Sequence, residues 1–346
     1  MSADFGRTDI MDHIVSHHER NANIELLRII AMLWIIADHF SLHGGFNFQT
    51  DSITLNNLWY QFTLMGGGIG NSIFIITSGY FLINSPKINL NRLKILWLEI
   101  FFYSVSIYTI LLSFGYVKFK IIDLVKILMP VTFRQWWFVT CYFTIYLIHP
   151  FINSFFKSIS KNLYRTILII FLILPIIMRV DRGLREIIWF IYLYIVGGYI
   201  RLYADNFGNK KYILLALFGI IINFVLTVIF DMLNFHRPLL FGYATLLYGR
   251  IIYITFFISV CLFIFFKHLK IDIPLINLIS SCTLGVYLIH ENKILRPIIW
   301  QNIFKNASYQ DSPYLIIYSV FVIVCVYISC VIIELLRQKI KKIIAR

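Results

Sequence analysis

Apolar residues dominate long stretches of this chain, and short polar segments separate them. The first apolar run extends from Asn23 to Phe40, and further runs of nearly twenty residues follow it. About twenty apolar residues are what an α-helix needs to cross the hydrocarbon core of a bilayer. The pattern therefore predicts an all-α integral membrane protein, a bundle of about ten transmembrane helices. We expect them approximately at 24–43, 60–83, 93–115, 136–156, 165–180, 187–204, 211–232, 245–267, 273–299 and 313–337.

Two of these predicted helices are less well defined than the others. The helix at 165–180 is short, contains Pro175 and ends in a charged stretch. The segment 237–250 is also compatible with a re-entrant piece instead of the start of the eighth helix. The number of helices is therefore about ten, with one more or one fewer still open.

Composition and charge support a membrane location. Hydrophobic residues make up 59% of the chain and charged residues only 14%, which is more apolar than a soluble domain of this size requires. The net charge of +14 would suggest nucleic-acid binding in a soluble protein. Here Lys and Arg lie mostly in connections and ends, where they suit anionic headgroups. They are more frequent in even-numbered connections and at both ends, which predicts that both termini lie in the cytoplasm.

The ends of the chain are polar. Residues 1–22 contain no apolar signal segment, so we expect a disordered cytoplasmic tail, then a membrane domain at 23–338 and a basic cytoplasmic tail at 339–346. The five cysteines fall in apolar runs without a CxxC pair, which is typical of small buried hydrophobic residues. Neither they nor the histidines of the N-terminal tail predict a metal site.

Three ionisable residues share one side of the first predicted helix. Arg28 and His39 are eleven positions apart, which is about 20° past three full turns and about 16 Å along the axis. Glu25 precedes Arg28 by three positions and lies on the same side. Ionisable side chains inside a membrane are costly, so the row predicts a functional site. The alternative is one structural ion pair, Glu25 with Arg28, and an unrelated histidine.

Histidine and arginine suit different tasks in such a site. Histidine transfers protons near neutral pH, whereas arginine holds a carboxylate, a phosphate or another polar part of a ligand. Asp38 lies about 100° round the helix from His39. This position allows the Asp38 carboxylate to orient a neighbouring side chain, and it equally allows the carboxylate to face water.

A second histidine belongs to the ninth predicted helix, in the run from Ser281 to Asn292. His290 reaches a depth similar to that of His39, so the two side chains can converge on one cavity. The alternative is an interfacial histidine next to solvent.

Basic residues also begin the third predicted helix. Arg92 and Lys94 are candidates for holding the phosphates of a nucleotide-like ligand, although positive-inside anchoring also accounts for them. Glu99 is a further intramembrane acid, expected to pair with Arg28, Arg92 or Lys94.

Several motifs of the chain together match those of a known family. Its first-helix pattern, an acidic residue before Leu-x-Arg and then Arg-x10-His, stands here at 25–39, although Glu25 replaces the usual Asp. The remaining patterns are Phe-x-x-x-Ser-Gly-Tyr at 74–80, Trp-Trp-Phe at 136–138, Tyr-Leu-Ile-His-Pro at 146–150 and Gly-x-Tyr-x-x-His at 285–290. In this order they make the chain resemble the bacterial acyltransferase family 3, membrane enzymes that acylate cell-surface glycans.

The resemblance implies a stand-alone member without an appended soluble domain. It implies transfer of an acetyl or similar short acyl group to a hydroxyl of a surface polysaccharide or a lipid-linked glycan. Acetyl-CoA is then a donor substrate from the cytoplasm and not a bound cofactor. The Arg-rich run that many members carry after the second helix is reduced here to Arg92 and Lys94.

The resemblance also implies roles for individual residues. His39 is expected to act as general base or to accept the acyl group transiently. Arg28 is expected to position the polar part of the donor or to stabilise charge, and Glu25 to support Arg28. The expected substrate-binding residues are Arg92, Lys94, Ser78, Trp137, Tyr287 and His290, with Tyr287 and His290 on the acceptor side.

Two other functions remain compatible with the sequence. Intramembrane charge and broken helices also suit a transporter or flippase that exports a glycan or a lipid-linked precursor. A membrane-embedded sensor or assembly partner would need no turnover.

Overall fold

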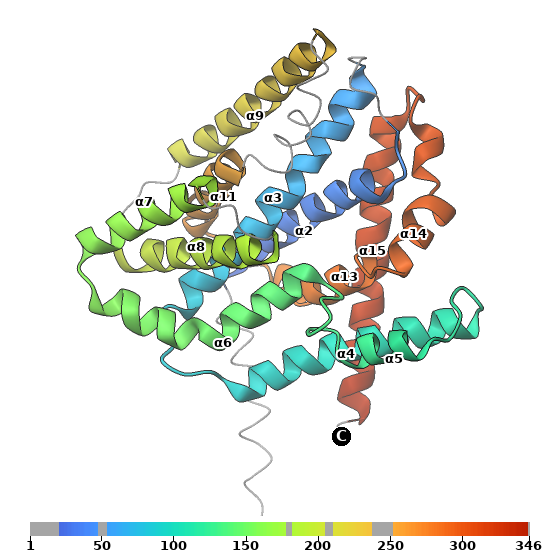
Figure 1. The fold of residues 1–346 in the computed structure, drawn as a ribbon, viewed down its shortest axis with the longest axis horizontal. Coiled ribbons are helices and arrows are strands. Elements are labelled where there is room, and N and C mark those ends of the chain that lie inside the picture. Colours follow the sequence, from blue (N-terminus) through green and yellow to red (C-terminus); the bar gives the residue numbers. More distant parts are fainter. Residues whose placement is uncertain (1–20, 48–53, 178–181, 205–209, 237–251, 345–346) are drawn as a thin grey trace, which may run out of the picture.

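The structure, a computed structural model, describes residues 21–47, 54–177, 182–204, 210–236 and 252–344. All regular secondary structure in these ranges is helical, which confirms the predicted all-α class (Figure 1). The longer helices are α2 (Ala22–His43), α3 (Leu55–Leu82), α4 (Leu90–Ser113), α6 (Trp137–Ser158), α7 (Lys161–Ile177), α8 (Arg182–Tyr203), α9 (Lys210–His236), α11 (Ile252–Lys267) and α15 (Leu315–Ile344). Shorter ones are α5 (Ile121–Leu128), α12 (Pro274–Ser280), α13 (Thr283–His290) and α14 (Leu295–Pro297), with one π-helical turn at Ile298–Ile303 and one 3-10 turn at Asn306–Tyr309.

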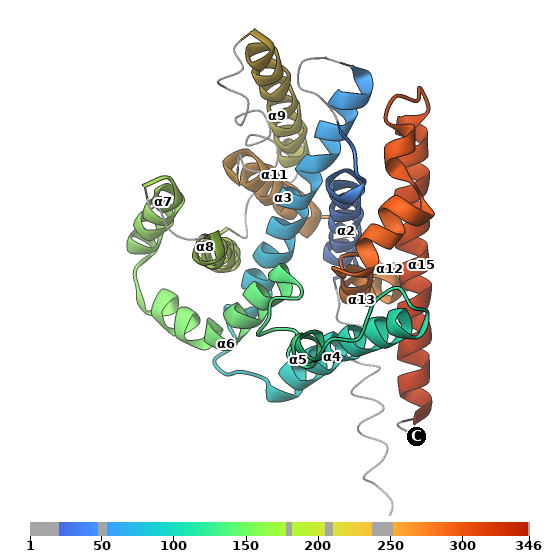
Figure 2. The same cartoon turned by 45° about the vertical axis from the view of Figure 1, so that its right-hand side comes forward.

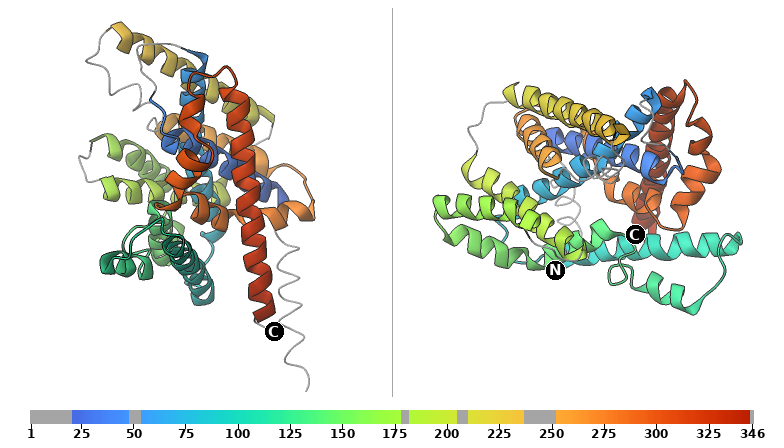
Figure 3. Two further views of the ribbon diagram at one scale, coloured as in Figure 1. Left: turned by 90° about the vertical axis from the view of Figure 1, so that its right-hand side faces the viewer. Right: turned by 45° about the horizontal axis from the view of Figure 1, so that its top comes forward.

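Five described helices, α4, α6, α8, α9 and α15, are long and apolar enough to cross a membrane. The surface of α15 fits this role, because Ile317, Phe321 and Ile328 are each more than half exposed, as side chains that face lipid are. Figures 2 and 3 show α15 as a long peripheral helix that leads to the C-terminus. The chain is thus a helical membrane protein, and the number of ten spans stays a prediction.

The ninth predicted helix is wrong as one continuous span. Instead of a helix over 273–299, the chain forms α12, a break at 281–282, α13 and then a turn after His290. The side chain of Asn292 accepts hydrogen bonds from the backbone N–H groups of Ile294 and Leu295, which holds this turn. His290 is thus the last residue of α13, and it is buried inside the protein instead of lying next to solvent.

Other boundaries differ less. Helix α3 begins at Leu55, five residues before the prediction, and α15 continues to Ile344. The connection that we expected to be a loop at 116–135 contains α5. The predicted re-entrant segment at 237–250 and most of the N-terminal tail lie outside the described residues.

Helices α2 and α3 form the centre of the bundle and pack closely against each other. A Cβ atom at Gly66 of α3 would overlap the backbone carbonyl of Trp34 on α2, so glycine permits this approach. Helix α2 also contacts α11, α12, α13 and α15. Residues on α2 are therefore surrounded by helices that lie far along the chain.

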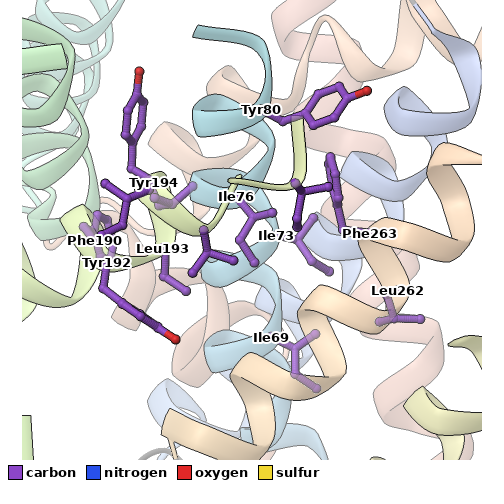
Figure 4. Packing of buried hydrophobic residues seen from close by; sticks show 14 of the residues in the cluster. Ile69, Ile73, Ile76, Tyr80, Phe190, Tyr192, Leu193, Tyr194, Leu262 and Phe263 are labelled. Carbon is purple, nitrogen blue, oxygen red and sulfur yellow. The ribbon is translucent and has the colours of Figure 1, made fainter. Parts of the chain in front are cut away.

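The second face of α3 packs against α8 and α11 (Figure 4). Ile73 and Ile76 of α3, Leu193 of α8 and Phe263 of α11 are almost fully buried in this cluster. This apolar core holds one side of α3, while the other side supports α2 and the polar residues on it.

Candidate active site

Helix α2 presents Glu25, Arg28 and His39 as the helical spacing predicts, because it is continuous from Ala22 to His43. Glu25 Oε2 lies 2.8 Å from Arg28 Nη1. The same oxygen accepts a hydrogen bond from the Ser280 hydroxyl at the end of α12. The ion pair is therefore anchored to a second helix and is more than a local contact along α2.

The structure brings His39 and His290 together at the other end of the row. Nδ1 of His39 lies 2.9 Å from Nε2 of His290. Nδ1 of His290 lies 2.6 Å from the backbone carbonyl of Val286, one turn earlier in α13. Both imidazoles are buried, so each polar contact is made in a water-poor environment.

This chain of contacts assigns the protons of the two imidazoles in their neutral forms. The Val286 carbonyl only accepts, so Nδ1 of His290 donates to it. A neutral imidazole has one N–H, which leaves Nε2 of His290 as an acceptor. Nδ1 of His39 therefore donates to His290, and Nε2 of His39 carries the free lone pair. The fold thus prepares one nitrogen atom as a proton acceptor.

Glu291 lies next to this pair and was missed by the sequence analysis. Its Oε2 atom lies 3.4 Å from His39 Nδ1 and 3.1 Å from His43 Nε2. Its Oε1 atom accepts from Arg296 Nη1 at 2.9 Å. One signal was available, because His43 follows His39 by four positions and so shares its helix face. Glu291 reaches His39 and His43 because α13 ends at His290 and the chain turns there. No local sequence pattern predicted this turn.

Asp38 lies on the lone-pair side of His39. Its Oδ2 atom is 3.9 Å from His39 Nε2, too far for a hydrogen bond but close enough for a strong electrostatic interaction. Gly67 of α3 faces this carboxylate, and a Cβ atom there would crowd it. A carboxylate in this position stabilises an imidazolium that forms at His39.

Ser78, another predicted binding residue, lies near the Arg28 end of the row. Its hydroxyl donates to the carbonyl of Phe74, and the Arg28 guanidinium lies 5.8 Å from the Phe74 ring centre. Tyr142 of α6 interacts with Ser78 and lies in the electric field of both Arg28 and Arg92. Ser78 therefore connects α3 to Tyr142 of α6 near the Arg28 end of the row.

Arg92 and Lys94 occupy the start of α4, and both side chains are exposed. The backbone N–H of Arg92 is capped by the Asn89 side chain. Their guanidinium and ammonium groups are accessible to a ligand that approaches from this end of α4.

The predicted pairing of Glu99 with Arg28, Arg92 or Lys94 is wrong. Glu99 Oε2 lies 3.2 Å from Arg337 Nη2, because Glu99 faces α15. Arg337 also makes two hydrogen bonds of 2.7 Å to Glu334, which in turn accepts from Tyr103. This buried network joins α4 to α15 and leaves Arg28 to pair with Glu25.

Two aromatic residues from the prediction differ in their distance from the histidines. The Tyr287 ring centre lies 6.0 Å from that of His290, so Tyr287 borders the histidine pair. Trp137 packs against Phe138 and Phe190, and Phe138 in turn contacts Tyr287. Trp137 is therefore one aromatic layer away from the imidazoles.

The site as a whole has two polar groups at the two ends of one helix face. One contains the guanidinium of Arg28, which donates to Glu25, and Glu25 in turn accepts from Ser280. The other contains a proton-accepting nitrogen on His39. Eleven residues of helix separate them, about 16 Å. This spacing suits an elongated ligand whose anionic part lies at one end and whose reacting bond lies at the other.

Comparison with known families agrees with the motifs. A family model described as an acyltransferase domain matches residues 21–334, nearly the whole chain. No curated protein and no solved structure matches the chain.

Proposed function

Since the chain belongs to the acyltransferase 3 family and is a membrane acyltransferase, we propose that it transfers an acetyl or similar short acyl group from acyl-CoA to a glycan hydroxyl. The acceptor is a surface polysaccharide or a lipid-linked glycan. The protein works in the plasma membrane with both termini in the cytoplasm, in keeping with its distribution of Lys and Arg. The family match does not favour the transporter alternative.

The observation that carries the proposal is the free lone pair on Nε2 of His39. The acceptor hydroxyl gives its proton to this atom as its oxygen bonds to the thioester carbonyl carbon. The carbon–sulfur bond then breaks, and the departing thiolate takes the proton from the His39 imidazolium. Atoms and charge balance, since the products are an ester and free coenzyme A. The alternative route, in which Nε2 first accepts the acyl group itself, uses the same atom.

Three neighbours of His39 support this step. His290 accepts the Nδ1 proton of His39 and so fixes both the tautomer and the ring orientation. Asp38, beside Nε2, stabilises the positive charge that develops on His39. Glu291 does the same from the Nδ1 side.

The donor extends from the Arg28 end of the row. Arg28 binds a polar part of acyl-CoA, and Arg92 and Lys94, exposed at the start of α4, attract its phosphates. The thioester at the far end of the pantetheine arm then reaches His39. Tyr287, bordering His290, lines the side from which the acceptor sugar enters.

The proposal is tested with the purified protein in nanodiscs and acetyl-CoA labelled in the acetyl group. We expect label to move to a glycan fraction from the source cell envelope, with release of free coenzyme A. Mild alkali should remove the label as acetate, because the product is an ester. Donor binding without any labelled product, across lipid-linked and polymeric acceptors, would contradict the proposal.

A further inference from the structure

Three potential metal-ligand atoms converge beside the histidine pair. His39, His43 and Glu291 each offer one ligand atom, and these atoms lie within 4.8 Å of one another. Oε2 of Glu291 is 3.4 Å from Nδ1 of His39 and 3.1 Å from Nε2 of His43. Two imidazole nitrogens and one carboxylate oxygen form a ligand set that zinc uses in proteins.

The spacing of these atoms suits a transition-metal ion. Zinc lies about 2.0–2.2 Å from its nitrogen and oxygen ligands, so ligand atoms in a tetrahedral site are about 3.3–3.6 Å apart. The two distances to Glu291 are already close to this separation. The two imidazole nitrogens lie within 4.8 Å of each other, so a side-chain adjustment of at most about 1.5 Å brings them to the same separation. Since the His43 side chain is 15% exposed, an ion can reach the site from solvent.

The surrounding charges decide whether a cation is tolerated there. Asp38, on the other side of the His39 ring, adds a second carboxylate to that of Glu291. Arg296 opposes the cation, because its Nη1 atom lies 3.5 Å from His43 Nε2. The same atom holds Oε1 of Glu291 at 2.9 Å, so Arg296 can leave His43 and keep Glu291. In that position it orients the carboxylate and leaves Oε2 for the ion.

We propose that His39, His43 and Glu291 form a binding site for a divalent transition-metal ion of the zinc class. For an ion to bind there, the proton on Nδ1 of His39 moves to Nε2, so that the lone pair of Nδ1 is free for the ion. Nε2 then no longer accepts a proton from the acceptor hydroxyl. Inhibition of acyl transfer by zinc follows, and that consequence alone rests on the proposed function.

Binding is tested on the full chain in nanodiscs, purified through a tag without histidines. The tail residues His13, His17 and His18 are replaced by alanine, because they provide ligands of their own. Zinc is titrated against a chromophoric chelator, and cobalt is used as an absorbing substitute. We expect one ion per chain and the intense visible absorption of a tetrahedral cobalt site.

The ligand set is tested with His43→Gln and Glu291→Gln, which keep the size of each side chain. We expect each to weaken zinc binding at least about tenfold, since a ligand contributes no less than the groups that orient it. His268→Gln is the matched control. His268 comes directly after Phe266 and Lys267 in the sequence. The backbone carbonyls of these two residues accept hydrogen bonds from the Asn23 side chain, at the opposite end of α2 from His39 and His43. This control should bind zinc normally.

The outcomes separate the site from the function. Absence of stoichiometric zinc, or equal binding by His43→Gln, Glu291→Gln and the control, would overturn the site. If the wild-type protein binds zinc as expected but transfers acyl groups at an undiminished rate with zinc bound, the metal site is supported. That result would instead contradict the role proposed for His39.

Discussion

His39 on α2 and His290 on α13 are 251 positions apart in sequence, yet their ring nitrogens lie 2.9 Å from each other. The contact is directional, because the Val286 carbonyl fixes the proton of His290 on the far side of its ring. In the proposed mechanism, His290 therefore positions His39. Of the two histidines, His39 carries the free lone pair, on Nε2.

This relationship predicts unequal effects of the two histidines. In His290→Ala, His39 remains but loses the acceptor that fixes its tautomer. We expect a smaller loss of turnover than in His39→Ala, where removal of a general base costs about 10²–10⁴-fold. The KM for acyl-CoA should change little, and the pH profile of turnover should shift. An unchanged pH profile with a raised KM would place His290 in substrate binding instead.

Arg28→Lys tests the donor end of the row. Lysine keeps the charge but loses the planar fork that pairs with Glu25 and a ligand at the same time. We expect weaker binding of acyl-CoA, measured by calorimetry in nanodiscs. Arg201→Lys is a suitable control, because it also removes a guanidinium fork but from an arginine that donates to the Tyr80 hydroxyl and not to Glu25. Equal donor affinity in Arg28→Lys and wild type would remove Arg28 from the donor site.

Glu25→Gln tests the support of Arg28 by a different route. Glutamine still accepts from Ser280 but no longer neutralises Arg28. We expect donor binding to weaken less than in Arg28→Lys, because the guanidinium itself is retained. Ser280→Ala, which removes one hydrogen bond from the same carboxylate, should have the smaller effect of the two. A larger effect of Ser280→Ala would show that the break between α12 and α13, and not charge, limits binding.

The buried network around Arg337 predicts a stability effect that is separate from catalysis. In Arg337→Met, the carboxylates of Glu99 and Glu334 lose their shared cation. Removing one partner of a buried ion pair costs about 3–5 kcal/mol. The melting temperature in detergent should therefore fall well below that of Lys339→Met, which removes an exposed charge from the same helix. Equal melting temperatures would mean that the network contributes little.

Gly66→Ala tests the contact between α2 and α3. The added methyl group meets the Trp34 carbonyl, so the two helices must separate or shift. Because α2 carries the site, we expect lower stability together with lower turnover. Gly115→Ala is not a suitable control, since Gly115 has a positive φ of 74°. Gly68→Ala is better, because its nearest neighbour is the Thr255 side chain. A normal melting temperature in Gly66→Ala would contradict such close packing.

Local patterns predicted the helical class and the arrangement of Glu25, Arg28 and His39, because both depend on spacing along one helix. They did not predict how α13 ends. Glu291 belongs to a turn whose position depends on capping by Asn292 and on packing of α13 against distant helices.

The error at Glu99 has a similar cause. Its expected partners were basic residues close by in sequence or in depth. Its actual partner, Arg337, lies more than two hundred residues later and faces it because α15 passes beside the site region. The order of helices in the sequence does not determine which helices are neighbours in the bundle. Ion pairs between helices depend on which helices are neighbours, so they cannot be predicted from that order.

The most direct test of the central claim compares wild type with His39→Gln for release of coenzyme A and transfer of labelled acetyl to glycan in nanodiscs. Glutamine approximates the size of the imidazole and still donates to His290, but it has no basic nitrogen. We predict normal donor binding and melting temperature, with transfer reduced by about 10²–10⁴-fold. Transfer at the wild-type rate in a folded, donor-binding His39→Gln protein would contradict the account.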